Sequence, residues 1–483
     1  MTQLGRKQLL INGEWRDAAD GRTMPVINPA TEETIAEVAS ASAADVDAAV
    51  VAARAAFIGP WGQMPARERG RLLWKLAERL TERIDEVARL ETLHNGKPIV
   101  ESRHIEIPMA AEVLQYYAGW ADKLHGDTVP VKAGSLVYTR REPLGVVAAI
   151  VPWNFPLLLA MWKVAPALAT GNTVILKPAS QTPLTALALG EMAGEVGFPP
   201  GVLNVVTGRG GTAGQALVEH PGVNKIAFTG DTATGKGIMR SAAETLKQVT
   251  LELGGKSPNI VFADADLDAA VRGATLGIFY GKGEVCAAGS RLLVDAAVKD
   301  EFLDKVAARA KKMVAGDPLD PKTRLGAISS KAQLERVLGY VETGKREGAT
   351  LIAGGSRTDI GTGKGFFMQP TVFAGVTPDM TIAREEIFGP VLAAIEFADV
   401  EEAIARANDS MYGLAAGIWT RDVRKAHYVA AKLQAGTVWV NTYNVYDVAA
   451  SFGGYKQSGF GRELGRHALD YYTQVKTVWV DLG

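Results

Sequence analysis

The chain has 483 residues, of which 47% are hydrophobic and 22% charged, and its 52 basic and 53 acidic residues nearly cancel. This length is too great for one small core and predicts a globular protein of two or more domains. The balanced charge and the lack of basic clusters disfavour a nucleic-acid partner, and no run of about 18 apolar residues could cross a membrane.

The first residues and the cysteine content bear on the cellular compartment. The opening MTQLGRKQLLINGEW lacks the apolar core of a signal peptide. Cys286 is the only cysteine, so no disulfide can form within the chain, and we expect a cytoplasmic protein. No metal site is expected, because the six histidines lack the spacing of metal-binding motifs.

Along the chain, the first strong pattern is helical and the next alternates strands with helices. Apolar residues recur at helical spacing over 64–94, which predicts one amphipathic helix ending at a Gly-Lys-Pro sequence. Five apolar runs then alternate with helical patterns, at 145–152, 172–178, 202–208, 225–230 and 248–255. Continuous apolar runs joined by helices are typical of an open parallel sheet covered on both faces, which binds ligands beyond the carboxyl ends of its strands.

A second α/β region is predicted after residue 255. Its helices are expected near 266–280, 297–314, 330–347, 399–408 and 422–435, with strands near 290–295, 391–397 and 437–441. Two more strand-like segments, 135–143 and 475–483, fit neither region and would be exposed edges if left alone. Pairing with each other, or with another subunit, would cover those edges.

Two glycine-rich turns follow strands of the predicted parallel sheet. Residues 207–214 (TGRGGTAG) and 228–235 (FTGDTATG) each lead into a helix. Glycine lets the backbone approach a ligand closely, and a helix N-terminus favours anions such as pyrophosphate. Neither turn has the full Gly-x-Gly-x-x-Gly pattern, so each could be a plain tight turn, but two in one sheet favour a nucleotide site.

Several reactive or polar residues have both a structural and a functional interpretation. Asn154 could donate an amide N–H to an oxyanion or serve as a turn residue. Glu252 ends an apolar strand, where burial would raise its pKa and suit a general base, unless it lies in solvent. Glu386 and Phe388 could bind a ribose or form a solvated loop. Cys286 could be an inert buried thiol or a nucleophile.

Taken together, the motifs resemble those of the aldehyde dehydrogenase superfamily from about residue 8 to the C-terminus. They include PWNFP, TGNTVILKPA, FTGDTATG, LELGGKSP, GEVCAAGSR, EEIFGPV and FGGYKQSGFGRELG. The resemblance implies an α/β fold with an open parallel-sheet cofactor domain at 1–121 and 144–254 and an α/β catalytic domain at 255–453. It also implies a β-strand oligomerisation arm at 122–143 and 464–483, in a homodimer or homotetramer.

The resemblance assigns the chemistry to five residues. Cys286 matches the nucleophile that attacks the aldehyde to give a thiohemiacetal and, after hydride transfer to a nicotinamide, a thioester. The Asn154 amide and the Cys286 backbone N–H match the oxyanion donors. Glu252 matches the base that activates water, so the implied product is a carboxylic acid rather than an acyl-coenzyme A. Glu463 and Lys163 match a proton relay.

The resemblance also identifies residues that would bind NAD or NADP and the aldehyde. Lys177 matches the residue that holds the adenosine ribose, and Glu386 matches the acceptor for the nicotinamide ribose. The full cofactor set is Val151, Pro152, Trp153, Lys177, Ser180, Gly210, Phe228, Thr229, Gly230, Asp231, Leu253, Glu386 and Phe388. The substrate set is aromatic and predicts an apolar, aromatic or quaternary-ammonium aldehyde; it comprises Phe155, Trp162, Tyr280 and Phe452.

Three matched positions depart from the family pattern: Ser180, Asp231 and Ser451, the last of which replaces a proline and should change only local loop stiffness. Ser180 stands where NAD-preferring members often carry a glutamate on the ribose; a serine can hydrogen-bond the 2′-phosphate that a carboxylate repels, so NADP is predicted to be accepted. Asp231 replaces a serine beside the pyrophosphate; it is a good helix N-cap, but its charge should disfavour phosphates. Two alternatives stay open: a structural protein, disfavoured by the intact catalytic residues, and an esterase, disfavoured by the complete cofactor cleft.

Overall fold

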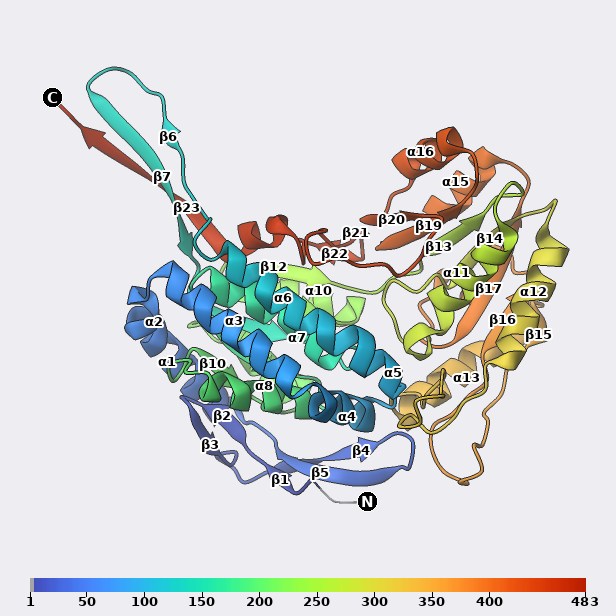
Figure 1. Cartoon of the computed structure of the whole chain (residues 1–483), viewed down its shortest axis with the longest axis horizontal. Coiled ribbons are helices and arrows are strands. Elements are labelled where there is room, and N and C mark those ends of the chain that lie inside the picture. Colours follow the sequence, from blue (N-terminus) through green and yellow to red (C-terminus); the bar gives the residue numbers. More distant parts are fainter. Residues whose placement is uncertain (1–3) are drawn as a thin grey trace.

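The computed structural model describes residues 4–483. Figure 1 shows two α/β bodies side by side, with a thin β-strand arm projecting from the first. The first body is built on an eight-stranded sheet with strand order β22-β12-β11-β8-β9-β10-β2-β3. The second is built on a seven-stranded sheet with strand order β15-β16-β17-β14-β13-β19-β20. The predicted α/β class is therefore confirmed.

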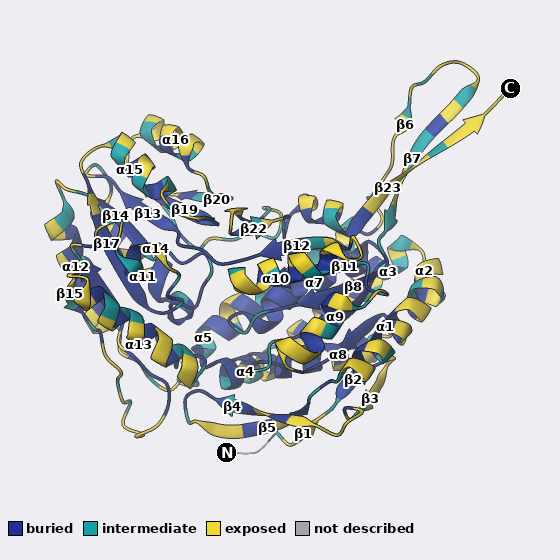
Figure 2. Ribbon diagram, turned by 180° about the vertical axis from the view of Figure 1, so that it is seen from behind, coloured by how far each residue is buried: buried dark blue, intermediate teal, exposed yellow. Residues whose placement is uncertain are grey.

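Five parallel strands form the centre of the first sheet, as predicted. They are β8 (Val146–Ile150), β9 (Thr173–Lys177), β10 (Leu203–Val205), β11 (Lys225–Thr229) and β12 (Gln248–Glu252). Every residue of β8 to β11 is buried, which is why these strands read as continuous apolar runs (Figure 2). Antiparallel strands complete the two edges: β2 (Leu9–Ile11) with β3 (Glu14–Arg16), and β22 (Gly459–Phe460).

Helices cover both faces of this sheet, and alternate strand residues enter different cores. Val147 and Ala149 pack in the core that contains α7, whereas Val146 and Ala148 pack in the core that contains α1. One face carries α1 (Ala43–Ile58), α9 (Gln215–Glu219) and α10 (Thr232–Ala243). The other carries α3 (Ala66–Glu82), α6 (Ile107–Trp120), α7 (Pro156–Ala169) and α8 (Leu184–Glu195).

The single helix predicted over residues 64–94 is wrong. The structure has two helices, α3 and α4 (Ile84–Asn95), separated at Arg83, whose φ of −99° and ψ of 19° are not helical. The apolar spacing continues across this break because both helices contact α6 and α8. The predicted end is correct, since Gly96 caps α4 with a left-handed φ of +85°.

In the second sheet, all strands are parallel except β15 at one edge. The strands are β13 (Pro258–Val261), β14 (Arg291–Asp295), β15 (Thr350–Ala353), β16 (Thr371–Ala374), β17 (Val391–Phe397), β19 (Ala415–Trp419) and β20 (Thr437–Val440). The helices fall inside the predicted ranges: α11 (Leu267–Phe279), α12 (Lys299–Lys312), α13 (Lys331–Arg346), α15 (Val400–Asn408) and α16 (Val423–Lys432).

Short elements connect and flank these bodies. A small sheet at the N-terminal side has the order β1 (Arg6–Lys7), β5 (Glu33–Ala39), β4 (Thr23–Asn28), and β18 (Tyr412–Gly413) pairs with β21 (Tyr455–Lys456). The short helices are α2 (Pro60–Gln63), α5 (Ile99–Glu101), η1 (Ser102–Glu106), η2 (Gly210–Gly214), η3 (Tyr280–Gly283), α14 (Thr381–Arg384) and η4 (Arg466–Tyr472).

The arm joins the two strand-like segments that the sequence left without partners. β7 (Ser135–Pro143) pairs antiparallel with β23 (Thr473–Asp481) over all nine residues, and β6 (Thr128–Val129) flanks β7. The prediction that these segments pair with each other is confirmed. The expectation that strand structure begins near residue 464 is wrong, because η4 occupies residues 466–472. The division into domains and the oligomeric role of the arm stay predictions.

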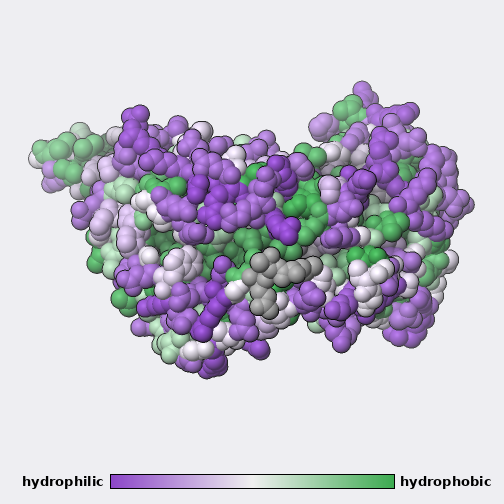
Figure 3. Space-filling view, turned by 60° about the horizontal axis from the view of Figure 1, so that its bottom comes forward, coloured by the Kyte–Doolittle hydropathy of each residue, from purple (hydrophilic) through white to green (hydrophobic). Residues whose placement is uncertain are grey.

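The arm also exposes apolar surface. Val475 and Trp479 of β23 are 61% and 62% exposed, and apolar side chains mark the end of the arm at the left of Figure 3.

Among residues 4–483, none of the helices combines the length and the apolarity needed to span a bilayer.

Candidate active site

Two cavities meet at Cys286, which among the described residues is the one that lines both. The larger, of about 450 Å³, lies at the carboxyl ends of the parallel strands β8, β9, β11 and β12. The smaller, of about 140 Å³, lies between α7 and the loops of the second body. A group bound in one cavity can therefore meet a group bound in the other only next to this sulfur.

The loop before Cys286 has an unusual backbone. Gly281, Lys282 and Gly283 all have positive φ, of 55°, 63° and 71°. At Gly283 the need for glycine is also steric, because a Cβ there would lie 2.3 Å from the carbonyl oxygen of Gly389. The sequence GKGEVC therefore turns tightly against the EEIFGP turn, which brings Cys286 close to Glu386.

Cys286 is half-buried, and its surroundings favour the protonated thiol. Burial, and after it the neighbouring Glu252 and Glu386, raise its pKa to about 12, against the opposing effect of the backbone N–H groups of Ala287 and Cys286. At neutral pH the cofactor-free protein therefore carries a thiol rather than a thiolate. A nucleophilic role requires that the bound reactants or a base remove this proton.

Asn154 keeps a hydrogen-bond donor free beside the sulfur. Its side chain is 5% exposed, and Nδ2 donates to the Glu284 carbonyl at 2.8 Å. An amide nitrogen has two hydrogens, and the second has no acceptor within residues 4–483. The backbone carbonyl of Asn154 accepts from Lys97 Nζ at 2.7 Å, which fixes the turn. The structure thus brings Asn154 and Cys286 to one cavity, as expected.

Glu252, Glu463 and Lys163 form a buried group behind the sulfur. Glu252 is the last residue of β12, and neither of its carboxylate oxygens has a partner within residues 4–483. Burial raises its pKa well above the usual range, Glu463 raises it further, and Lys163 opposes both. Lys163 pairs with Glu463 and donates to the Thr229 hydroxyl at 2.6 Å. Glu252 lines neither cavity, so its carboxylate lies outside the space open to ligands.

All thirteen predicted cofactor residues line the larger cavity. Lys177 is buried, which lowers its pKa to about 8, and its Nζ donates to the Pro178 carbonyl at 2.9 Å. Gly210 begins η2, and a Cβ at this position would meet no atom within 4 Å, so the backbone faces open space. Burial raises the pKa of Glu386 to about 7, and its Oε1 accepts from the Gly255 N–H at 2.9 Å. Phe388 packs edge-on against Trp153 at 5.3 Å.

The helix-cap prediction for Asp231 is confirmed. Its side chain accepts from the Thr234 N–H at 2.9 Å and from the Thr234 hydroxyl, and so caps α10. Sequence reasoning missed Gln333 and Arg336, which reach the cavity from α13. Gln333 donates to the Phe388 carbonyl at 2.7 Å and Arg336 to the Glu386 carbonyl at 3.0 Å. No local pattern could have linked this surface helix to a distant loop.

The four predicted substrate residues all line the smaller cavity, and none of the described residues in its lining is charged. Phe155 stacks on Tyr280 at 6.2 Å, and Trp162 contacts Phe452 at 5.4 Å. The sequence analysis missed Ile105, Met109, Leu158, Leu159, Leu276, Val285, Asn444 and Tyr446. Leu158 and Leu159 share a helix face with Phe155 and Trp162, so helical spacing could have identified them. Tyr446 lies on a loop, where no periodicity operates.

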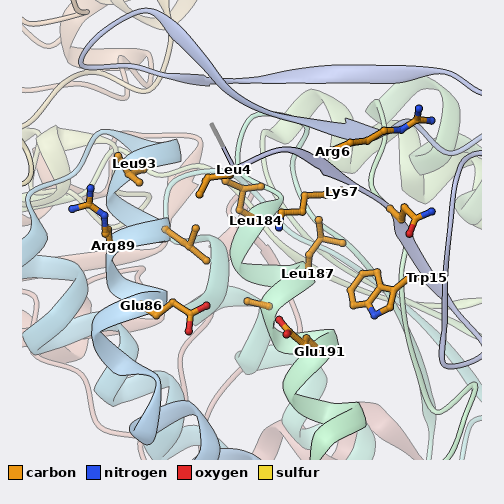
Figure 4. Close-up of a pocket in the computed structure, with 13 residues that line it drawn as sticks. Leu4, Arg6, Lys7, Trp15, Glu86, Arg89, Leu93, Leu184, Leu187 and Glu191 are labelled. Atoms are coloured by element: carbon orange, nitrogen blue, oxygen red, sulfur yellow. The ribbon is translucent and has the colours of Figure 1, made fainter. Parts of the chain in front are cut away.

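A third cavity lies apart from this site. It measures about 450 Å³ and lies between the N-terminal strands and helices α4 and α8 (Figure 4). Its floor is apolar, from residues such as Leu184 and Leu187, and its rim carries both signs of charge, including Arg89 and Glu191. None of the predicted site residues lines it.

Comparisons with known proteins agree with this geometry. Residues 15–478 match the aldehyde dehydrogenase family. The chain is 52% identical over 476 residues to the mitochondrial aldehyde dehydrogenase of Homo sapiens, covering 98% of this chain and 92% of the relative. It is 50% identical over 479 residues to retinal dehydrogenase 2 of Mus musculus, with coverages of 98% and 92%.

A solved structure extends the comparison to the fold. The NAD+ complex of the aldehyde dehydrogenase from Bacillus cereus matches with a TM-score of 0.97 and 51% identity, covering 99% of this chain and 97% of the other. Because one relative is mitochondrial, the cytoplasmic expectation stays a prediction. The chain belongs to the aldehyde dehydrogenase family and is an oxidoreductase.

Proposed function

We propose that the chain oxidises an aldehyde to a carboxylic acid with NAD+ or NADP+ through thiohemiacetal and thioester intermediates on Cys286. The observation that carries this proposal is the position of Cys286, which alone among the described residues lines both a glycine-rich cavity and an uncharged one. Hydride transfer from an apolar substrate to a nucleotide cofactor needs this arrangement, because both reactants must meet at one residue.

The larger cavity suits a dinucleotide. Open backbone at Gly210 and the N-terminus of α10 favour a pyrophosphate, while Lys177 and Glu386 lie where each could hold a ribose. The NAD+ complex of the Bacillus cereus relative supports NAD as the cofactor. When bound, its nicotinamide would accept the hydride that leaves the substrate carbon.

The first step uses Cys286 and Asn154. Glu252 takes the proton of the Cys286 thiol, the sulfur attacks the aldehyde carbon, and the carbonyl oxygen becomes an oxyanion stabilised by the free Asn154 amide hydrogen and the Cys286 backbone N–H. Loss of hydride from this carbon restores a carbonyl and leaves a thioester on the sulfur.

The second step uses Glu252. Ionised Glu252 takes a proton from water, the resulting hydroxide attacks the thioester, and the acid leaves as the Cys286 sulfur departs. Because Glu252 lines neither cavity, its side chain must turn toward the sulfur for this step. The adjoining Glu463–Lys163 pair can receive the proton that Glu252 takes up.

NADP acceptance is supported by the surroundings of Ser180. Ser180 also lines a neighbouring cavity of about 610 Å³, which carries Arg209 and Lys331. Arg209 forms no ion pair within residues 4–483, and Lys331 pairs with Glu335 only at 3.9 Å. Two weakly paired cations beside a serine favour a 2′-phosphate. Replacing Arg209 by glutamine should lower kcat/KM for NADP while leaving kcat/KM for NAD unchanged; an equal loss for both cofactors would contradict this role.

The smaller cavity favours a compact apolar or aromatic aldehyde. A dry cavity of roughly 150 Å³ in another protein holds one benzene ring, and this cavity of about 140 Å³ is of similar size. The contacts among Trp162, Tyr446 and Phe452 could also hold a quaternary ammonium group by cation–π attraction. Among the described residues that line this cavity, none is charged, so none would bind the carboxylate of a carboxylate-bearing aldehyde.

Reactions of the purified protein with a panel of aldehydes test the proposal. The full chain is mixed with NAD or NADP and with aliphatic, aromatic, quaternary-ammonium or carboxylate-bearing aldehydes, and nicotinamide reduction is followed by absorbance. We expect reduction to be fastest with benzaldehyde-sized aldehydes. Absence of reduction with every aldehyde would overturn the proposed function.

We also propose that the arm assembles a homodimer or homotetramer. The outer edge of β23 has no partner strand within residues 4–483, and its exposed Val475 and Trp479 would be covered by a second copy. Sedimentation of the wild type and of Val475→Asp/Trp479→Asp tests this, with a monomeric wild type as the contrary result.

A further inference from the structure

A group of charged side chains lies fully buried beneath the loop that carries Cys286. Its members come from α4 to η1 and from the loop itself, and each is at most 6% exposed: Glu91, His94, Lys97, Glu101, Glu106, Lys282 and Glu284. Charged residues are almost never fully buried unless they are paired. None of these seven residues has a role in the proposed mechanism, so their burial needs another explanation.

Lys282 has the least favourable position in this group. It is a non-glycine residue with φ of +63°, between two glycines that are also left-handed. A left-handed conformation is unfavourable for a residue other than glycine, because its Cβ crowds the following carbonyl oxygen. Strain of this kind persists only where the surrounding contacts impose it, and it is frequent at functional sites.

The contacts that hold Lys282 connect two separate segments. Its Nζ donates to the backbone carbonyl of Asn95 at 2.9 Å and to Asn95 Oδ1 at 2.8 Å, and it pairs with Glu284 at 2.8 Å. Asn95 in turn donates from Nδ2 to the carbonyl of Trp153 at 2.6 Å. Through Asn95, the loop that carries the nucleophile is therefore joined to the turn that carries Asn154.

A second connection runs directly between these segments. The Asn154 side chain donates to the carbonyl of Glu284, two residues before Cys286. The Glu284 carboxylate accepts from the Ser329 N–H at 3.0 Å, and Glu101 accepts from the Gly281 N–H at 3.4 Å. Both ends of the loop segment 281–284 are thus fixed by buried side chains or backbone groups.

We propose that Asn95, Lys282 and Glu284 form a clamp that sets the distance between the Cys286 loop and the Asn154 turn, with Lys282 as its positioning residue. This inference rests on the proposed function, because the distance matters only if Asn154 and the Cys286 N–H stabilise one oxyanion. Those two donors come from different segments, and a productive site tolerates displacements of only about 0.5 Å. The clamp supplies the rigid link between them.

The substrate cavity is tied to the same group. Lys97 Nζ lies 4.5 Å above the Phe155 ring, pairs with Glu106, and donates to the Asn154 carbonyl. The Tyr280 hydroxyl lies 3.4 Å from Glu106 Oε1. The stacked rings of Phe155 and Tyr280 therefore rest on the buried charges, so the clamp and one wall of the cavity share their support.

The test removes the clamp without leaving an unpaired buried charge. Lys282→Met/Glu284→Gln keeps the volume and an acceptor for Ser329, but removes the donor to Asn95. Lys282→Gln/Glu284→Gln is the matched variant, with the same charge and a shorter N–H donor that restores part of the link. Lys282→Gly/Glu284→Gln relieves the left-handed strain and serves if the methionine variant does not fold.

Two reactions of Cys286 separate positioning from general damage. Acylation by a p-nitrophenyl ester needs the oxyanion donors, whereas alkylation by iodoacetamide does not. Loss of one oxyanion donor costs about 100- to 1000-fold in rate, so we expect displacement to lower the acylation/alkylation ratio about 10- to 100-fold. The dissociation constant for NAD should be unchanged, and the glutamine variant should lie between the methionine variant and wild type.

A remote variant provides the control for lost stability. Asp45 is buried and accepts from the Ala19 N–H at 3.0 Å, far from the loop, so Asp45→Asn should lower the thermal midpoint without changing the ratio. A folded clamp variant whose ratio stays within about twofold of wild type overturns the clamp. A wild type that is alkylated but neither acylated nor able to oxidise aldehydes overturns the proposed function instead, so the two failures are distinct.

Discussion

The raised pKa of the half-buried Cys286 thiol gives a quantitative prediction about its reactivity without cofactor. With a pKa raised to about 12, mainly by burial, only about 3 in 100,000 molecules carry a thiolate at about pH 7.5, since the fraction falls tenfold per pH unit below the pKa. Because Cys286 is the only cysteine, iodoacetamide labelling followed by intact-mass spectrometry reports on this one group. The logarithm of the labelling rate should rise with a slope of one from about pH 7 to 10, without a plateau.

Glu252→Gln should raise the rate of iodoacetamide labelling, although it should lower the rate of catalytic turnover. Glu252 is the second cause of the raised thiol pKa, after burial. Its removal lowers the pKa, and because a less basic thiolate is also a weaker nucleophile, labelling should speed up only about threefold per unit of pKa. A plateau with a midpoint below about pH 9 in wild type, or slower labelling of Glu252→Gln, would refute the reasoning.

Four further outcomes are expected. Glu252→Gln should release about one equivalent of reduced cofactor and then stall, as stopped-flow absorbance would show; undiminished steady turnover contradicts its role as base. Ser180→Glu should lower the NADP/NAD ratio of kcat/KM at least tenfold, and an unchanged ratio counts against Ser180. Leu158→Trp, which fills the substrate cavity, should raise KM for benzaldehyde about tenfold and leave KM for NAD alone; equal changes in both would be contrary. Burial raises the pKa of Glu101 to about 8, so wild type loses stability as pH rises from about 5 to 8, by roughly 4 kcal/mol. Glu101→Gln should therefore gain in thermal midpoint relative to wild type over that range, and a constant difference would be the refuting result.

The elements that could be predicted from the sequence are those whose environment is uniform along their length. β8 and β11 lie wholly inside one sheet, so their burial appears directly as apolar runs. The break at Arg83 does not interrupt the apolar pattern of the sequence, because α3 and α4 present apolar faces to the same neighbouring helices on both sides of it. Residues 466–472 (RHALDYY) hold only two strand-favouring residues, the tyrosines, and they form η4, which contacts α7.

The residues of the candidate site also differ in whether the sequence could predict their role. Cys286, Asn154 and Glu252 lie in sequence motifs whose resemblance to the family predicts that they share one site. The structure brings these three residues together. Lys282 and Glu284 read as ordinary surface charges, because a sequence does not show whether a lysine is solvated or buried. Their burial depends on Asn95, which lies 187 residues away from Lys282 and reaches it only in the folded chain.

In the proposed reaction, burial favours stabilisation of the oxyanion but opposes loss of the protons on Cys286 and Glu252. The positions of these two residues reconcile the two effects. A low-dielectric surrounding strengthens the hydrogen bonds to an oxyanion, but it also keeps the proton on Cys286 and on Glu252. In the resting protein the raised pKa favours the protonated Cys286 thiol, which slows oxidation and alkylation of the only thiol of the chain. Reactivity must then arise where charge is introduced, and Cys286 lies at the junction of the two cavities, where both reactants arrive. Because Glu252 lies outside both cavities beside the Lys163–Glu463 pair, the base can exchange its proton through the protein rather than through the aldehyde's cavity.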